Sequence, residues 1–184
     1  MLDTDFRAAQ LKVAKTLTNV WELARLRRAQ QGEAALGGFT RLLSGLPDQP
    51  VRKVEWELEG DTDTLGHRFL VVRARTEARL ECQRCMQLFD QALKVDTRLL
   101  LVESESELED EESQEDDPEA PDRVLGSMHF DVLELVEDEL ILALPYVPRH
   151  EVCPSLPEAL QVQEEGSETG RPSPFSVLAA LKKD

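Results

Sequence analysis

The stretch that decides the fold is Phe69–Cys82, which reads FLVVRARTEARLEC. Its apolar and polar residues alternate with a period of two, which is the repeat of a β-strand with one buried face. One face carries Leu70, Val72, Ala74, Ala78 and Leu80, and the other carries Arg73, Arg75, Glu77, Arg79 and Glu81. The segment therefore predicts a long strand with one dry side and one wet side.

Two flanking segments, Val51–Glu59 and Leu88–Val102, repeat this alternation. Three such strands predict an antiparallel sheet of three to five strands, packed with helices into an α+β fold. The arginines on the wet face could form an RNA-binding face. Pairing with acids on neighbouring strands is favoured, because cross-strand pairs of opposite charge stabilise a sheet.

On either side of these strands, apolar residues recur at the spacing of an α-helix. Residues 6–31 have it and predict one or two helices that end near Gly32. Met128–Phe130 predicts a short added strand. Asp131 then resembles a helix cap, and the apolar stripe after it continues to Pro145.

The C-terminal part predicts a tethered helix. The segment from Pro154 to Pro172 is polar and reads as a linker, and Ser173-Pro174 is a good helix start. The apolar residues of this helix are Phe175, Val177, Leu178 and Leu181. So short a helix is unstable alone in water, so it docks on its own domain or on a partner. We thus expect an N-terminal helical extension (residues 1–32), an α+β domain (33–153), and a linker with a C-terminal amphipathic helix (154–184).

Charge is distributed unevenly along the 184 residues, whose formal net charge is −16. The stretch Glu103–Asp122 contains twelve acids and no base, and it predicts an acidic disordered loop. An acidic chain argues against broad nucleic-acid binding and favours a basic partner, such as a ribosomal protein. The sequence shows neither a secretory signal nor an apolar run long enough to span a membrane, and its three cysteines are an odd count. These features indicate the reducing cytoplasm.

Cys82 and Cys85 lie three positions apart, and so do His150 and Cys153. Together they would form a tetrahedral four-ligand site of the structural zinc type. A CxxC alone also fits a redox pair or two ordinary buried thiols. The redox interpretation is the weaker one, because a redox CxxC usually opens a helix and no helical pattern follows Cys85.

Glu137, Asp138 and Glu139 follow one another on the predicted helix that Asp131 begins. Three adjacent carboxylates point around a helix and do not converge, so a catalytic pair is not expected. Solvation, or contact with a basic partner, is the favoured interpretation.

Three blocks of the sequence together resemble one family. They are LECQRC at residues 80–85, VEDELILALP at 136–145 followed by VPRH at 147–150 and Cys153, and PSPFSVLAALK at 172–182. Their order and wording resemble the bacterial YceD family, the large ribosomal RNA subunit accumulation proteins. The first twenty residues look like an added extension, and Ser173 stands where the family commonly has Asn.

The resemblance implies a non-catalytic, cytoplasmic ribosome biogenesis factor required for normal synthesis, processing or accumulation of 23S rRNA. Its partners would be the large-subunit rRNA precursor or ribosomal proteins, contacted directly or indirectly. The alternative is a zinc-stabilised adaptor that binds a basic protein partner and affects RNA indirectly. An enzyme is disfavoured, because the sequence offers no Gly-rich phosphate loop and no Ser-His-Asp pattern for its three histidines, His67, His129 and His150.

Overall fold

The computed structural model describes residues 16–108 and 120–154. The elements in chain order are β1 (Leu17–Thr18), α1 (Val20–Leu26), β2 (Ala29–Ala35), the 3₁₀ helix η1 (Leu36–Gly38), β3 (Lys53–Thr62), β4 (Arg68–Glu81), β5 (Leu88–Val102), α2 (Glu105–Leu108), β6 (Arg123–Leu125), β7 (Phe130–Asp131) and α3 (Val132–Leu142). By its contacts the chain divides into two units, residues 1–153 and 154–184, and Pro154 is the one described residue of the second.

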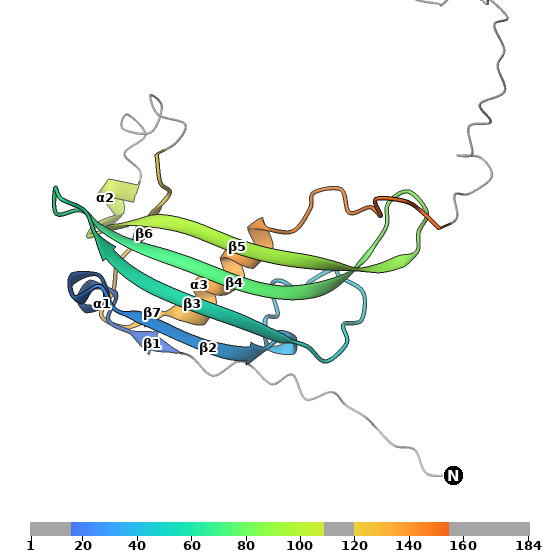
Figure 1. The fold of residues 1–184 in the computed structure, drawn as a ribbon, viewed down its shortest axis with the longest axis horizontal. Coiled ribbons are helices and arrows are strands. Elements are labelled where there is room, and N and C mark those ends of the chain that lie inside the picture. The colour runs from blue at the N-terminus through green and yellow to red at the C-terminus, as the bar shows by residue number, and fades with distance from the viewer. Residues whose placement is uncertain (1–15, 109–119, 155–184) are drawn as a thin grey trace, which may run out of the picture. The chain divides into compact units, whose positions relative to one another are not determined.

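The central element is a five-stranded sheet with the order β2-β3-β4-β5-β6. Helix α3 crosses one face of this sheet (Figure 1). The pairs β2–β3, β3–β4 and β4–β5 are antiparallel, and β6 joins β5 in parallel. A separate two-stranded sheet joins β1 to β7. The predicted α+β class is thus confirmed, and the parallel β5–β6 pair departs from the purely antiparallel sheet that we expected.

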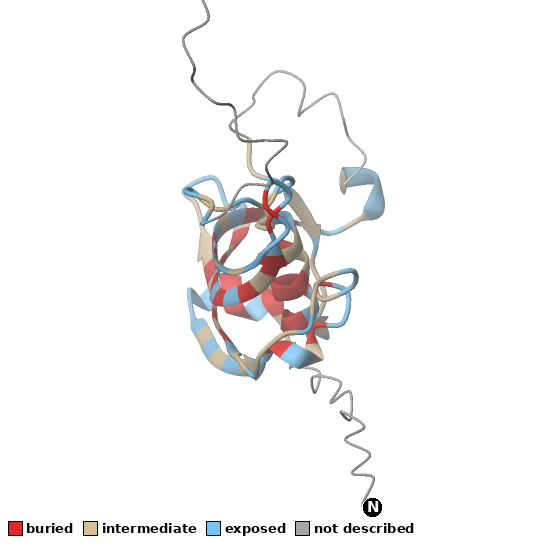
Figure 2. Ribbon diagram, turned by 90° about the vertical axis from the view of Figure 1, so that its right-hand side faces the viewer, coloured by how far each residue is buried: buried red, intermediate tan, exposed pale blue. Residues whose placement is uncertain are grey.

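The core lies between the sheet and α3, where buried positions gather in the interior (Figure 2). The inner face of β4 buries the residues that the alternation predicted. Helix α3 contributes Val132, Val136 and Leu140, each with no exposed surface. Its N-cap is Asp131, as the sequence predicted, and the carboxylate accepts a hydrogen bond from the Leu133 N–H at 3.2 Å. The helix ends at Leu142, before the predicted end of its apolar stripe.

The outer face of the sheet is covered by ion pairs that follow the strand register. Arg73 lies opposite Glu57 on β3 and opposite Asp96 on β5, and its guanidinium contacts both carboxylates, at 3.3 and 3.5 Å. Arg79 and Asp90 form another directly opposed pair at 3.3 Å. The predicted cross-strand pairing is confirmed. Because these guanidinium groups already meet carboxylates, the face offers few free cations to a phosphate backbone.

The β4–β5 hairpin continues beyond its neighbour β3, whose pairing with β4 ends at Glu55 and Arg75. Beyond Arg75, the backbone of β4 bonds to the Gln49 side chain and no longer to β3. Gln49 donates its amide N–H to the Arg79 carbonyl at 2.8 Å and accepts the Arg79 N–H at 2.7 Å. The hairpin is therefore held in place up to its turn, which carries Cys82 and Cys85.

The predicted helix end near Gly32 is wrong. Helix α1 ends at Leu26, and Arg27 adopts a left-handed conformation with a φ of 47°. The chain then enters β2, and the Arg28 carbonyl accepts the Gly60 N–H at 2.9 Å. Gly60 lies so close to the α1 backbone that a side chain there would overlap it. Residues 29–32 are thus an edge of the sheet, and the division of the chain at residue 32 stays a prediction.

Three other regions differ from expectation or fall outside the described residues. The short strand expected at Met128–Phe130 is β7, shifted to Phe130–Asp131. In the acidic segment, residues 105–108 form helix α2 where the sequence predicted disorder, and residues 109–119 lie outside the described part. Within residues 16–108 and 120–154, no helix is long and apolar enough to cross a membrane.

Candidate metal centre

The first two candidate ligands come from the turn between β4 and β5. The Cys82 N–H donates to the Gln87 carbonyl at 2.9 Å, and the Met86 N–H donates to the Cys82 carbonyl at 2.8 Å. Met86 completes the turn in the left-handed region, with a φ of 59°. This tight turn buries both thiols, Cys82 with no exposed surface and Cys85 with 8%.

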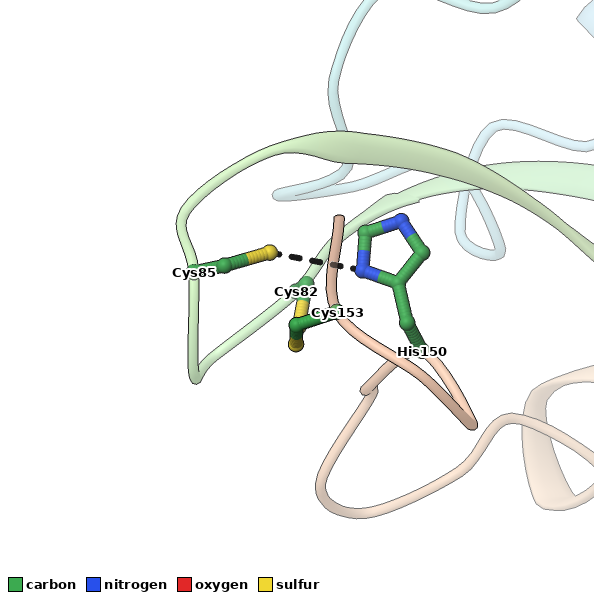
Figure 3. A group of neighbouring side chains, drawn as sticks. All are labelled: Cys82, Cys85, His150 and Cys153. Atoms are coloured by element: carbon green, nitrogen blue, oxygen red, sulfur yellow. Dashed lines mark hydrogen bonds between the residues drawn. The ribbon is translucent and has the colours of Figure 1, made fainter. Parts of the chain in front are cut away.

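The other two ligands come from the segment that follows α3. After Pro145 the chain returns to the hairpin turn, where the Gln83 N–H donates to the Pro148 carbonyl at 2.9 Å. Arg84 adds a second link, donating to the His150 carbonyl at 3.3 Å. The two segments therefore meet through their backbones, and this contact brings His150 and Cys153 to the thiols of the turn (Figure 3).

The four ligand atoms of Cys82, Cys85, His150 and Cys153 lie within 4.8 Å of one another. The Sγ atoms of Cys82 and Cys153 are 3.7 Å apart, and Cys85 Sγ is 3.4 Å from His150 Nδ1. A tetrahedron with Zn–S bonds of about 2.3 Å and a Zn–N bond of about 2.0 Å has edges of about 3.8 Å and 3.5 Å. These two separations thus already match the edges of a zinc site.

The surroundings favour the thiolate at Cys82 and oppose it at Cys85. Burial raises the pKa of Cys82, but hydrogen bonds from the backbones of His150, Cys85 and Arg84 outweigh it and lower this pKa to about 5. Burial raises the pKa of Cys85, and the neighbouring Cys82 and Cys153 sulfurs act in the same direction. The Arg84 Nε–H donates to Cys153 Sγ at 2.9 Å. Three thiolates and one divalent cation sum to −3 + 2 = −1, which the guanidinium of Arg84 can offset.

The other interpretations of the CxxC fit this geometry less well. All three cysteines are free thiols, and the 3.7 Å between the Cys82 and Cys153 sulfurs is far from the disulfide bond length of about 2.0 Å. The turn is followed by strand β5, so no helix N-terminus follows Cys85 to lower a redox thiol pKa. His150 also has a fixed orientation, because its ring packs on Phe89 with centroids 4.7 Å apart. The four residues therefore fit a structural metal site, and their donor atoms suit zinc.

The acids of α3 lie elsewhere in the fold. The Glu137 carboxylate, with 12% of its side chain exposed, accepts the backbone N–H groups of Arg41 at 2.7 Å and of Leu42 at 3.1 Å. Glu139 accepts the Thr97 hydroxyl at 2.7 Å. Solvation is therefore the wrong interpretation for these two acids. Asp138, which is half-exposed, meets the Arg41 guanidinium at 2.7 Å. Contact of the three acids with a basic partner stays a prediction.

The remaining predicted contact residues, Phe175, Val177, Leu178 and Leu181, lie outside the described residues, and their docking role stays a prediction. Sequence reasoning missed Arg84 as a support of the site. Its position between Cys82 and Cys85 could have indicated this role, because a guanidinium next to two thiols can donate a hydrogen bond to a thiolate. The Gln83–Pro148 contact had no such signal, since it joins two backbones.

Comparison with known proteins gives the following matches. The model of the family described as "Large ribosomal RNA subunit accumulation protein YceD" matches residues 70–182. A curated protein of that name from Haemophilus influenzae is 32% identical over 124 residues, which are 60% of this chain and 63% of the relative. The chain thus spans less than two thirds of that relative's length. No solved structure matches the chain. The family match contains all but the first two residues of β4, together with β5, α3 and all four candidate ligands.

Proposed function

The chain belongs to the YceD family, and on this premise we propose that it is a non-catalytic ribosome biogenesis factor required for normal accumulation of 23S rRNA. The observation that carries this proposal is the family match over residues 70–182, which covers both halves of the candidate metal centre. The ion pairs over the outer sheet face support action through partners, because they leave little positive surface for RNA. We place this action in the cytoplasm.

A complementation experiment tests the proposed function. In a bacterium deleted for its own family member, the amount of 23S rRNA relative to 16S rRNA should fall, and expression of this full chain should restore it. Northern analysis would show whether precursors accumulate or the mature RNA is lost. An unchanged ratio in the deletion strain, or a failure of the abundant chain to restore it, would contradict the proposal.

We also propose that Cys82, Cys85, His150 and Cys153 hold one zinc ion that stabilises the fold. The ion would tie the hairpin turn to the segment after α3, and its binding energy would contribute to folding. The convergence of the four ligand atoms within 4.8 Å favours the second candidate function, a zinc-stabilised adaptor that binds a basic protein partner and affects RNA indirectly.

Metal analysis of the purified chain tests the zinc proposal. We expect about one equivalent of zinc per chain, and Cys82→Ser should lower both the zinc content and the melting temperature. Gln83→Ser is a matched control in the same turn, because its exposed side chain is not a ligand. A metal-free chain whose melting temperature does not change in a chelator would refute the site.

A further inference from the structure

The end of the molecule that carries the metal centre also carries exposed apolar side chains. Five of the twelve large apolar residues that are exposed in the described part of the chain belong to the hairpin turn and the segment after α3. They are Met86 (64% exposed), Leu88 (52%), Tyr146 (98%), Val147 (49%) and Val152 (84%), and we call them the tip patch. Burying side chains of this size is favourable by roughly 1.5–3 kcal/mol each, so their shared exposure suits an interface.

The members of the tip patch lie on the two segments that carry the candidate ligands, within four residues of a ligand in the sequence. Met86 follows Cys85, and Val152 precedes Cys153. The ligand atoms converge within 4.8 Å, so their sequence neighbours on the two segments surround the same point. Cys82 and Cys85 are buried and His150 and Cys153 are partly buried, whereas Met86 and Val152 beside them are exposed. The candidate metal centre would thus support the tip patch from the interior.

The charge of this area favours a protein partner over RNA. Residues 81–88 and 145–154 hold two bases, Arg84 and Arg149, and two acids, Glu81 and Glu151, so their formal charges sum to zero. RNA binding draws its affinity from an excess of cations against phosphates, which is absent among these residues. The whole chain, at −16, attracts a basic protein at long range. Tyrosine and methionine beside arginine are also the residue types enriched at protein interfaces.

We propose that the tip patch docks on an apolar spot of a net-basic protein in the large-subunit precursor. This inference rests on the proposed function for the identity of the particle, and on the exposure and charge of the patch for the class of partner. Tyr146, the most exposed member, inserts into the partner, and Met86 and Val152 contact the rim of the same spot.

Photocrosslinking in cells tests the proposal with the full chain. A chain carrying p-benzoylphenylalanine at position 146 should crosslink to a basic large-subunit protein that mass spectrometry identifies. The matched control carries the same group at Leu65, which is 81% exposed in the β3–β4 turn at the opposite end of the sheet (Figure 1). A crosslink to RNA, to another copy of the chain or within the chain itself would overturn the proposal, as would equal crosslinking from the control position.

A sedimentation assay separates the two classes of partner. The variant Tyr146→Ser with Val152→Ser should bind purified large-subunit precursor particles about tenfold more weakly than the unaltered chain. It should keep its zinc content and melting temperature, and Leu65→Ser should bind normally. Equal binding of the patch variant, or strong binding of the unaltered chain to protein-free 23S rRNA, would refute the tip patch as a protein-docking surface. If the protein crosslink forms but the deletion strain keeps normal 23S rRNA, the proposed function fails and the docking surface stands.

Discussion

Glu137→Ala should destabilise the fold strongly, although Glu137 lies far along the chain from the groups it bonds. Its carboxylate accepts two backbone N–H groups of the segment before β3, at 2.7 and 3.1 Å, and the Arg41 Nε–H at 3.1 Å. Removing it leaves two donors without partners, each of which costs about 1–3 kcal/mol when buried. Because Arg41 is partly exposed and water can reach it, we expect a total loss of about 3 kcal/mol. That is a large share of a typical domain stability of about 5–15 kcal/mol.

The neighbouring Asp138 provides a matched control on the same helix. It also meets Arg41, but 48% of its side chain is exposed and it bonds no backbone N–H that the structure shows. Asp138→Ala should therefore cost about 0–1 kcal/mol, the range of a solvent-screened pair. Urea unfolding followed by circular dichroism gives both values. A cost for Glu137→Ala within about 1 kcal/mol of the Asp138→Ala value would refute the reasoning. The buried, backbone-bonded carboxylate would then contribute no more to the free energy of unfolding than the exposed one.

Three further outcomes are expected. Hydrogen bonding and charge from Arg52, opposed by burial, lower the pKa of Asp90, so the stability that Asp90 contributes is present above about pH 4 and is lost as the pH falls through the lowered pKa. The difference in unfolding free energy between the unaltered chain and Asp90→Asn should therefore shrink on acidification. A difference that stays constant with pH would contradict this. Gly60→Ala should cost about 1–3 kcal/mol or more in the same urea assay, because its Cβ would overlap the α1 backbone, and a neutral result would show that the helix shifts freely. Deleting residues 109–119 should leave the melting temperature nearly unchanged, since the stretch has no apolar residue, and a loss of cooperative unfolding would show a structural role.

The long strands could be predicted from the sequence because each has one buried face. Strand β2 could not, since its AQQGEAA sequence has weak alternation and becomes a strand by pairing with β3. The end of α1 was likewise not predictable, because it lies where Gly60 of β3 approaches the helix backbone. The basic residues after Leu26 gave no sequence signal that the helix ends there.

The candidate metal centre was more predictable than its surroundings. Two ligand pairs with a spacing of three carried enough chemistry to place Cys82 and His150 in one group, because the sequence has only three cysteines and three histidines. The role of Glu137 was not predictable, because its partners are backbone N–H groups 95 and 96 residues away and a row of acids carries no sign of them. Sequence patterns report which side chains suit a site, and they do not report which distant backbone groups need an acceptor.

The Gln49 amide that bonds Arg79 also bears on self-association. A long hairpin that outgrows its sheet exposes unpaired N–H and C=O groups, and such an edge can recruit a strand from another molecule. The Gln49 side chain bonds both the N–H and the C=O of Arg79. A side-chain amide offers no further backbone groups, so no additional strand can pair beyond it. At Arg79, the extension of β4 toward the candidate metal centre is thereby blocked against strand addition. The chain can carry its cysteine turn beyond the sheet without making that edge a seed for aggregation.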